Sequence, residues 1–416
     1  MDKIPDVFEG VEKRIEVRFS DNRSLFRGLR SLSRAIWDEF CFKCRCSIIH
    51  HDSTAFYDSY ILSESSLFVF DDRAMIKTCG TTVPLEGLDF LVVRACEIGL
   101  TPIDMTYTRS NFLFPDLQVH PYNDVNRELD YLSEMVIGGE LVPGKSSILG
   151  DMKGRYWFAH HKKFSLEYTP GDITVVTPPS ASDRYRIYSG GSDHIMVDVI
   201  MTGIDKDTCK IYHKDPMKSD DVNAGIMGES LRRILPEFKT ISGKCYDPCG
   251  YSCNAFHEDR YMTVHITPEE AFSYASVEAL FPCDLEPLST IENDYPALNH
   301  SISGSTVASD GDSSSALIFS ISNFIQNVTS FFKPRDALIT ILSRCETTAS
   351  DFESLASQLP TTFSVKSTPG KSKLIYSQST DPISSQNMLG EDIVASSVFY
   401  STVSSGGTGN KPPGLS

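Results

Sequence analysis

The stretch Leu62-Ser-Glu-Ser-Ser-Leu-Phe-Val69 places Ser63, Glu64, Ser65 and Ser66 inside a run that is otherwise apolar. The residues around it, from 60 to 70, are rich in the aromatic and β-branched side chains that favour a strand. A serine-rich break in such a run is most often a turn or a solvated edge. The break therefore needs support from other segments before chemistry can be assigned to it.

Strand-like and helix-like segments alternate from the N-terminus to about residue 290. Runs rich in β-branched and aromatic residues predict strands at 60–70, 74–79, 196–201, 261–266 and 337–342. Apolar residues recurring every three or four positions predict helices at 25–40, 85–97, 124–136, 268–280 and 317–332. This mixture predicts an α+β or α/β fold.

The last third of the chain is rich in serine and threonine. Residues 301–315 interleave serine with Gly and Asp, and this composition predicts a disordered insertion. Residues 346–416 form a Ser/Thr-rich extension, in which 363–365 and 374–376 are weak edge-strand candidates. The tail from 406 to 416 has the composition of a disordered terminus.

The charge balance and the cysteines exclude some classes of protein. The 416 residues carry 38 Lys+Arg against 55 Asp+Glu, and a net charge of -17 argues against a nucleic acid as the main partner. Eleven cysteines, an odd number, do not fit a secreted disulfide scaffold. The N-terminus lacks an apolar signal region, and no stretch approaches the roughly 18 apolar residues of a membrane span. We therefore expect a cytosolic (cytoplasmic) protein without a membrane partner.

A cysteine cluster leaves a zinc-dependent binding module as one alternative. Cys41, Cys44 and Cys46 are spaced closely enough to hold zinc, and His50 and His51 could add nitrogen ligands. A structural zinc site normally needs four well-spaced ligands, so ordinary thiols are favoured and no metal is expected. The glycine-containing turns at 80–82, 189–192 and 225–228 match neither the P-loop pattern GxxxxGK[ST] nor GxGxxG, and the sequence has no GxSxG or HExxH motif.

Four further segments accompany the serine-rich break. They are Phe8-Glu-Gly-Val-Glu-Lys-Arg14, Lys77-Thr-Cys-Gly-Thr-Thr82, Tyr246-Asp-Pro-Cys-Gly-Tyr-Ser252 and Val264-His-Ile-Thr-Pro-Glu269. Together with the serine-rich break, and in their order along the chain, these segments resemble the eukaryotic S-adenosylmethionine decarboxylases. Those are pyruvoyl-dependent enzymes of spermidine and spermine synthesis. Gly28-Leu-Arg-Ser-Leu-Ser33 and Phe272-Ser-Tyr-Ala-Ser276 look most similar to plant-type members.

The resemblance covers about residues 7–290, with a weaker match at 317–342. It implies an α+β fold, a four-layer αββα sandwich with an internal duplication that occupies residues 1–345. No repeat is visible in the sequence itself.

The resemblance also implies that the chain cuts itself between Glu64 and Ser65, giving a β chain of residues 1–64 and an α chain that starts at Ser65. Ser65 would become a pyruvoyl group that forms a Schiff base with the substrate, without pyridoxal phosphate. The products would be decarboxylated S-adenosylmethionine and CO2. Ser252 and His265 would transfer protons during processing.

The local pattern around His265 agrees with that role. Tyr261, Thr263 and His265 share one face of an alternating strand, and this face is polar enough to border a site. A histidine considered alone would more often be a satisfied core residue.

The remaining site residues are assigned by the same resemblance. Cys79 would return a proton to the substrate carbon, which requires a tuned and exposed thiol. Glu9 and Glu12, three positions apart, would lie beside the cationic substrate and help to transfer protons.

The other side chains would bind the substrate. Phe8 and Tyr246 would stack on the adenine, Glu269 would accept hydrogen bonds from the ribose, and Glu64 would contact the substrate. Position 246 is a tyrosine where the family pattern has phenylalanine, so its hydroxyl needs a partner.

Animal members of the family bind putrescine in an acidic pocket. Glu16, Asp198 and Glu278 match its acidic positions, but His194 stands where an aspartate is expected and Arg14 replaces a leucine. A built-in cation could replace the diamine, so we expect putrescine not to be required. The αβ unit is expected to be a monomer or a homodimer.

A catalytically dead paralogue that activates a decarboxylase partner is the main alternative. Such a regulator has no need to keep Glu64, Ser65, Cys79, Ser252 and His265 together. Their joint presence favours the enzyme.

Overall fold

The computed structural model describes the larger part of the chain. The described residues are 8–21, 27–141, 144–150, 155–164, 167–169, 172–174, 194–247, 249–282, 313–343 and 394–401. The edge-strand candidates at 363–365 and 374–376, the tail at 406–416 and residues 301–312 of the expected insertion lie outside them.

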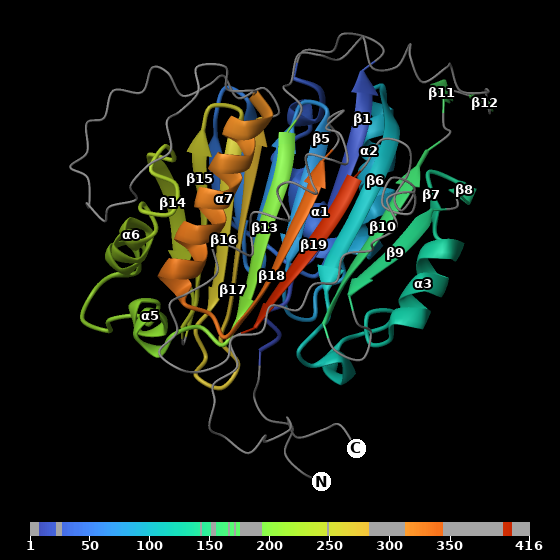
Figure 1. Ribbon diagram of the computed structural model, residues 1–416. Coiled ribbons are helices and arrows are strands. Elements are labelled where there is room, and N and C mark those ends of the chain that lie inside the picture. Colours follow the sequence, from blue (N-terminus) through green and yellow to red (C-terminus); the bar gives the residue numbers. More distant parts are fainter. Residues whose placement is uncertain are drawn as a thin grey trace.

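The first of two large sheets has eight antiparallel strands in the order β2-β3-β4-β5-β1-β6-β10-β9 (Figure 1). These strands are β1 (Lys13–Asp21), β2 (Ile48–Ser53), β3 (Tyr57–Leu62), β4 (Ser65–Phe70), β5 (Arg73–Thr78), β6 (Leu100–Ser110), β9 (Lys145–Gly150) and β10 (Tyr156–Lys163). The short ribbons β7 (Val136–Ile137) with β8 (Glu140–Leu141), and β11 (Glu167–Thr169) with β12 (Asp172–Thr174), lie outside this sheet.

The second sheet has seven antiparallel strands in the order β14-β15-β16-β17-β13-β18-β19. They are β13 (His194–Thr202), β14 (Thr240–Cys245), β15 (Tyr251–His257), β16 (Arg260–Thr267), β17 (Tyr274–Pro282), β18 (Asp336–Ser343) and β19 (Val394–Ser401). Its order repeats that of the first sheet position by position: β13 occupies the place of β1, β15-β16-β17 that of β3-β4-β5, and β18 that of β6.

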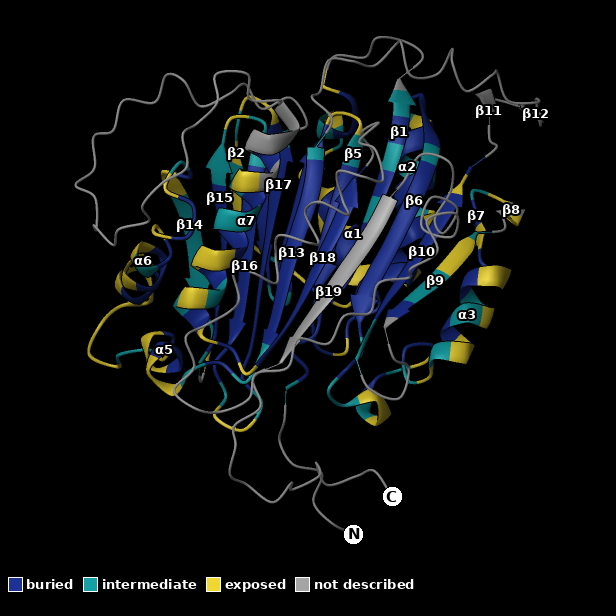
Figure 2. Ribbon diagram, viewed as in Figure 1, coloured by how far each residue is buried: buried dark blue, intermediate teal, exposed yellow. Residues whose placement is uncertain are grey.

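Helices accompany both sheets. They are α1 (Arg34–Lys43), α2 (Leu88–Glu97), α3 (Val125–Glu134), α5 (Lys206–Ile211), α6 (Asp220–Ser230) and α7 (Ser313–Phe332), with 3-10 turns η1 (Gly28–Ser31), η2 (Pro84–Gly87) and η3 (Pro115–Leu117). Helix α2 packs on β6, α6 on β14 and β15, and α7 on β13 and β17. The central strands are almost wholly buried, whereas helices such as α3, α5 and α6 have exposed residues (Figure 2).

The two sheets contact each other through side chains. The rings of Phe68 on β4 and Tyr261 on β16 stack with centroids 4.0 Å apart. The hydroxyl of Tyr57 on β3 donates to the Arg260 carbonyl on β16, 2.8 Å away. Each sheet is therefore buried on the face that meets the other, and polar groups between them must find partners there.

Most predicted elements are confirmed. The strands at 74–79, 196–201, 261–266 and 337–342 correspond to β5, β13, β16 and β18, and the helices at 85–97, 124–136 and 317–332 to α2, α3 and α7. Asp124 is the N-cap of α3, where its carboxylate accepts from the N–H groups of Asn126 and Arg127.

The helix predicted at 268–280 is wrong, because most of this segment is strand β17. Its side chains alternate: Tyr274 and Leu280 pack toward the first sheet, whereas Ala275, Val277 and Ala279 pack into the core that contains α7. A strand buried on both faces has few polar residues to mark its period, so it resembles a helix in sequence.

Four predicted boundaries also differ. Residues 60–70 form two strands, β3 and β4, with a tight turn at 63–64, and the predicted helix 25–40 is a 3-10 turn followed by α1. Helix α7 begins at Ser313, inside the expected insertion. The extension expected beyond residue 345 contributes β19, which pairs with β18.

Candidate active site

The turn between β3 and β4 presents the Glu64–Ser65 peptide to the space between the sheets. Ser65 is the first residue of β4, pairs with Leu62 across the turn, and has a φ of 122°. This region of backbone space favours glycine, and a serine held there is strained by roughly 1–3 kcal/mol. The strain is located at the bond where cleavage is expected.

The Glu64 carbonyl oxygen faces two donors from the residue that follows β5. The backbone N–H of Cys79 donates to it at 3.0 Å, and the Cys79 thiol lies 3.4 Å from it. Donors placed in this way stabilise negative charge that develops on a carbonyl oxygen under attack.

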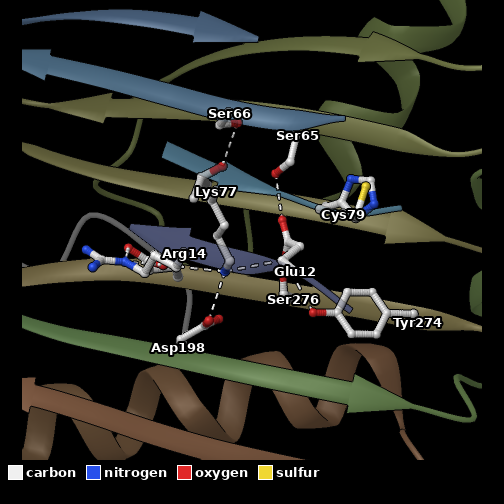
Figure 3. A network of polar contacts seen from close by, with 12 residues as sticks. Glu12, Arg14, Ser65, Ser66, Lys77, Cys79, Asp198, Tyr274 and Ser276 are labelled. Atoms are coloured by element: carbon white, nitrogen blue, oxygen red, sulfur yellow. Dashed lines mark hydrogen bonds and ion pairs between the residues drawn. The ribbon is translucent and has the colours of Figure 1, made fainter. Parts of the chain in front are cut away.

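The Ser65 hydroxyl faces a carboxylate. Its Oγ donates to Oε1 of Glu12 at 2.6 Å, while Oε2 accepts from Ser276 and from Tyr274 (Figure 3). Burial raises the pKa of Glu12, but the Lys77 cation and these hydrogen bonds outweigh it, so the pKa falls below its usual value. Glu12 is therefore an ionised base in contact with Ser65.

Ser252 and His265 lie opposite each other on β15 and β16. The Ser252 hydroxyl and Nδ1 of His265 are 2.7 Å apart, and both side chains are buried. Burial lowers the pKa of His265, although the nearby Glu12 carboxylate opposes this, so the ring is neutral near pH 7. The hydrogen-bond partner of the Ser65 hydroxyl is Glu12, and the processing roles of Ser252 and His265 stay predictions.

Cys79 does not have the exposed setting that its role led us to expect. The side chain has 0% of its surface exposed, and burial together with the Glu64 and Glu12 carboxylates raises its pKa well above the usual value. Its Sγ also lies 3.6 Å from Oε2 of Glu64. The thiol is therefore a buried, protonated group with polar neighbours, which suits a donor better than a nucleophile.

Four of the five residues at the expected diamine site are joined by one charge network. Arg14 pairs with Glu278 at 2.9 Å and with Glu16 at 2.8 Å, and Asp198 belongs to the same network through Lys77. His194 is placed differently, since its Nε2 lies 3.2 Å from Asp259 and burial lowers its pKa to about 4.

Lys77 occupies the centre of this network and was not assigned a role from the sequence. Its ammonium lies 2.8 Å from Asp198 and 3.4 Å from both Glu12 and Glu278 (Figure 3). Burial lowers the pKa of Lys77, but the three carboxylates raise it more, so it stays charged. It links the diamine site to the base at Ser65. The sequence signal that could have identified Lys77 is a lysine inside the otherwise apolar run of β5.

Two of the four expected substrate-binding residues, Phe8 and Glu64, lie beside Gly80. A Cβ built on Gly80 would lie 3.1 Å from Oε2 of Glu64 and 3.4 Å from the Phe8 ring, so both side chains reach this point. The Tyr246 hydroxyl donates to the Leu62 carbonyl at 2.8 Å, which supplies the partner that this tyrosine needs.

Glu9 and Glu269 are placed less directly. The Glu9 carboxylate accepts from the N–H groups of Val11 and Phe114, and burial raises its pKa. Burial likewise raises the pKa of Glu64. Glu269 is half-buried in the turn after β16, where its carbonyl accepts from the Phe272 N–H. The role of Glu269 stays a prediction.

Comparison with known proteins decides the family. The family model described as adenosylmethionine decarboxylase matches residues 5–297, more than half of the chain. The chain belongs to the adenosylmethionine decarboxylase family. An S-adenosylmethionine decarboxylase proenzyme of Drosophila melanogaster is 34% identical over 65% of this chain and 74% of its own length. One of Helianthus annuus is also 34% identical, over 66% and 71%.

A solved structure of this family is also similar. The Trypanosoma brucei AdoMetDC-delta26 monomer covers 81% of this chain and 98% of its own, with a TM-score of 0.48 and 17% sequence identity. The fly and sunflower decarboxylases are equally similar in identity, so identity does not single out the plant-type members.

The zinc alternative finds no support. In the part of the chain that the structure describes, no group of three or more His, Cys, Asp or Glu is arranged to hold a metal ion, and Cys41, Cys44 and Cys46 are free thiols. A search of the same residues finds no helix that is both long and apolar enough to span a membrane.

Proposed function

We propose that the chain is an active, self-processing decarboxylase that converts S-adenosylmethionine to its decarboxylated form and CO2. One observation carries the proposal: Ser65 Oγ lies 2.6 Å from an ionised Glu12 while Cys79 holds the Glu64 carbonyl from its other side. An inactive binding protein gains nothing from a strained serine placed between a base and two carbonyl donors.

Self-processing begins at Ser65. Glu12 takes the hydroxyl proton, and Oγ attacks the Glu64 carbonyl carbon, whose oxygen is stabilised by the Cys79 N–H. The peptide C–N bond then breaks as Glu12 returns the proton to the departing nitrogen, which leaves an ester and a free Ser65 amine. Relief of the strain at Ser65 favours this step.

The ester is resolved by elimination. A base removes the Ser65 α-proton, the Cβ–Oγ bond breaks, and Glu64 leaves as the carboxyl end of the β chain. Water then replaces the nitrogen of the dehydroalanine, ammonia departs, and a pyruvoyl carbonyl remains at residue 65. We assign these proton transfers to His265 and Ser252, which are 2.7 Å apart.

The residues around position 65 fit such a group, since its carbonyl would replace a side chain that already contacts catalytic groups. A pyruvoyl carbonyl supplies the electron sink for decarboxylation that no standard side chain provides. Phe8 and Tyr246 hold the adenine, and Cys79 returns the proton to the substrate carbon. The raised pKa values of Glu9 and Glu64 allow these carboxyls to exchange protons as well.

We propose that the two sheets and their helices form the four-layer αββα sandwich with an internal duplication. The equal strand orders of the two sheets support a duplication, and α2 and α7 hold equivalent places before β6 and β18. The cytosolic location, the 1–64 and 65–416 division and the choice between monomer and homodimer stay predictions.

The direct test is release of CO2 from carboxyl-labelled S-adenosylmethionine by the purified chain alone. The proposal predicts turnover that is lost in Ser65→Ala. Absence of turnover by the natural chain, with activation of a partner decarboxylase, would instead support the dead regulatory paralogue.

A further inference from the structure

Lys13 is a buried cation that the proposed mechanism does not use. It lies at the start of β1, between Glu12 and Arg14, with 0% of its side chain exposed. Successive residues of a strand point to opposite faces. The Glu12 and Arg14 side chains therefore point into the charge network between the sheets, whereas the Lys13 side chain points to the other face of its sheet. Its ammonium reaches the backbone beside the Cys79 thiol instead.

The contacts of this ammonium are to neutral groups. Nζ donates to the Gly80 carbonyl at 2.9 Å and to Oε1 of Gln118 at 3.0 Å. The rings of Phe112 and Tyr122 lie 5.0 and 4.9 Å away, close enough for cation-π attraction. Among the described residues, it forms no salt bridge with a carboxylate.

Burial without an ion pair is costly for a cation. It lowers the pKa of Lys13 to about 8, although Cys79, Glu9 and Glu128 oppose the shift. A methionine of similar length would avoid this cost and pack well between the two rings. A lysine at position 13 therefore lowers the stability of the fold and places a positive charge near the site.

The segment Cys79–Gly80 is held at four backbone points, one of which is the Cys79 carbonyl, which accepts from the Thr82 hydroxyl at 2.7 Å. The Cys79 N–H donates to the Glu64 carbonyl, the Gly80 N–H donates to the Glu9 carbonyl at 2.9 Å, and Lys13 holds the Gly80 carbonyl. Gly80 has a φ of 63°, and glycine adopts many backbone conformations at little cost. The direction of its carbonyl is therefore set by these hydrogen bonds. Lys13 thus fixes the residue that follows the thiol.

We propose that Lys13 is a positioning residue for proton return: its ammonium holds the Gly80 carbonyl and so orients the Cys79–Gly80 segment that carries the thiol. The inference rests on the proposed function and deepens it. The cation also favours the ionised forms of Glu9 and Glu64, the carboxyls nearest the same segment.

The alkaline loss of activity distinguishes this role from simple support. The titratable and charged groups that face Lys13 are Cys79, Glu9, Glu64, Glu128, Arg109 and Tyr122. The pKa values of Cys79 and Tyr122 are raised well above their usual range, and Arg109 stays charged. Burial also raises the pKa values of Glu9 and Glu64, so the Lys13→Arg variant is needed to identify Lys13, whose pKa is about 8, as the group behind the alkaline loss of activity.

The test uses the cleaved holoenzyme and expresses kcat per pyruvoyl group. Lys13→Met is expected to lower kcat about tenfold or more with KM changed less than about twofold, because the thiol is misplaced rather than the substrate. Lys162→Met is the matched control. Lys162 is also buried, donates to the Met135 carbonyl at 2.9 Å, and has a pKa lowered to about 8, but it lies on β10 away from the thiol.

Lys13→Arg tests the role of the charge at position 13 even if the methionine variant fails to fold. We expect the natural enzyme to lose kcat above about pH 8 and Lys13→Arg to retain it, since the guanidinium stays charged. Equal kcat for Lys13→Met and Lys162→Met, or an unchanged alkaline limb in Lys13→Arg, overturns the inference. Failure of the natural chain to cleave or decarboxylate overturns the proposed function instead.

Discussion

Ser65 and Glu12 lie 53 positions apart in the sequence, yet the serine Oγ and the glutamate Oε1 are 2.6 Å apart. Ser65 is the first residue of β4 and Glu12 immediately precedes β1, and both strands pair with β5. Lys77 on β5 supplies the positive charge that keeps Glu12 ionised. A single three-strand unit thus brings together nucleophile, base and counter-charge.

Glu12→Gln is expected to slow cleavage between residues 64 and 65 about a hundredfold, because an amide accepts the Ser65 hydrogen bond but cannot take its proton. The half-time of cleavage on denaturing gels measures this effect. Glu16→Gln is the control, since Glu16 is on the same strand but pairs with Arg14. Equal half-times for both variants would rule out Glu12 as the base.

The natural chain is expected to show little or no activation by putrescine, because Arg14 already pairs with Glu16 and Glu278. Arg14→Leu should create a several-fold activation by freeing these carboxylates for the ammonium groups of the diamine. Arg18→Leu is the control. Arg18 is also on β1, but it pairs with Asp104 on β6. Assays of processed enzyme with and without putrescine measure this, and strong activation of the natural chain would contradict it.

Tyr246→Phe is expected to keep KM for S-adenosylmethionine within about twofold, whereas Tyr246→Ala raises it roughly fivefold to a hundredfold by removing the stacking ring. The phenylalanine variant loses the hydrogen bond to the Leu62 carbonyl and about 1 kcal/mol of stability. Steady-state kinetics and thermal unfolding measure both effects. A KM for Tyr246→Phe that matches Tyr246→Ala would show that the hydroxyl, not the ring, binds substrate.

Asn254 forms a fully satisfied buried junction between the sheets. Its oxygen accepts from Ser66 at 2.8 Å and Thr263 at 2.9 Å, and its nitrogen donates to Ser59 at 2.9 Å and the Tyr60 carbonyl at 3.2 Å. Asn254→Leu leaves these groups unpaired and should lower the free energy of unfolding by about 2–4 kcal/mol.

Urea unfolding in a Ser65→Ala background, which prevents cleavage, measures this loss. Ser66→Ala removes one donor and should cost only about 1 kcal/mol. A loss for Asn254→Leu no larger than that of Ser66→Ala would argue against the junction.

Several features could be predicted because they depend on local pattern. Alternation along 261–266 identified the polar face that carries His265, and this face does meet the first sheet at Tyr261 and Thr263. The roles assigned to the substrate and processing residues came from the motif resemblance, and they stay predictions. Cys79 was expected to be exposed because its assigned role calls for an accessible thiol, and the sequence does not show which side chains cover it.

The rest depends on tertiary pairing. β17 was mistaken for a helix because both of its faces are buried. The Lys77 network joins residues from β1, β5, β13 and β17, and the sequence does not reveal that these strands face one another. The proposed duplication is supported by the corresponding strand orders of the two sheets, which the sequence does not reveal.

The central claim, self-cleavage at Glu64–Ser65, is tested most directly by a denaturing gel and intact mass of the purified chain. The account predicts two chains, residues 1–64 and residues from 65 onward, with the larger lighter than its serine-ended form by the mass of ammonia. Ser65→Ala should remain one chain. A natural chain that stays whole, or a larger fragment that begins with an unmodified serine, would contradict the account.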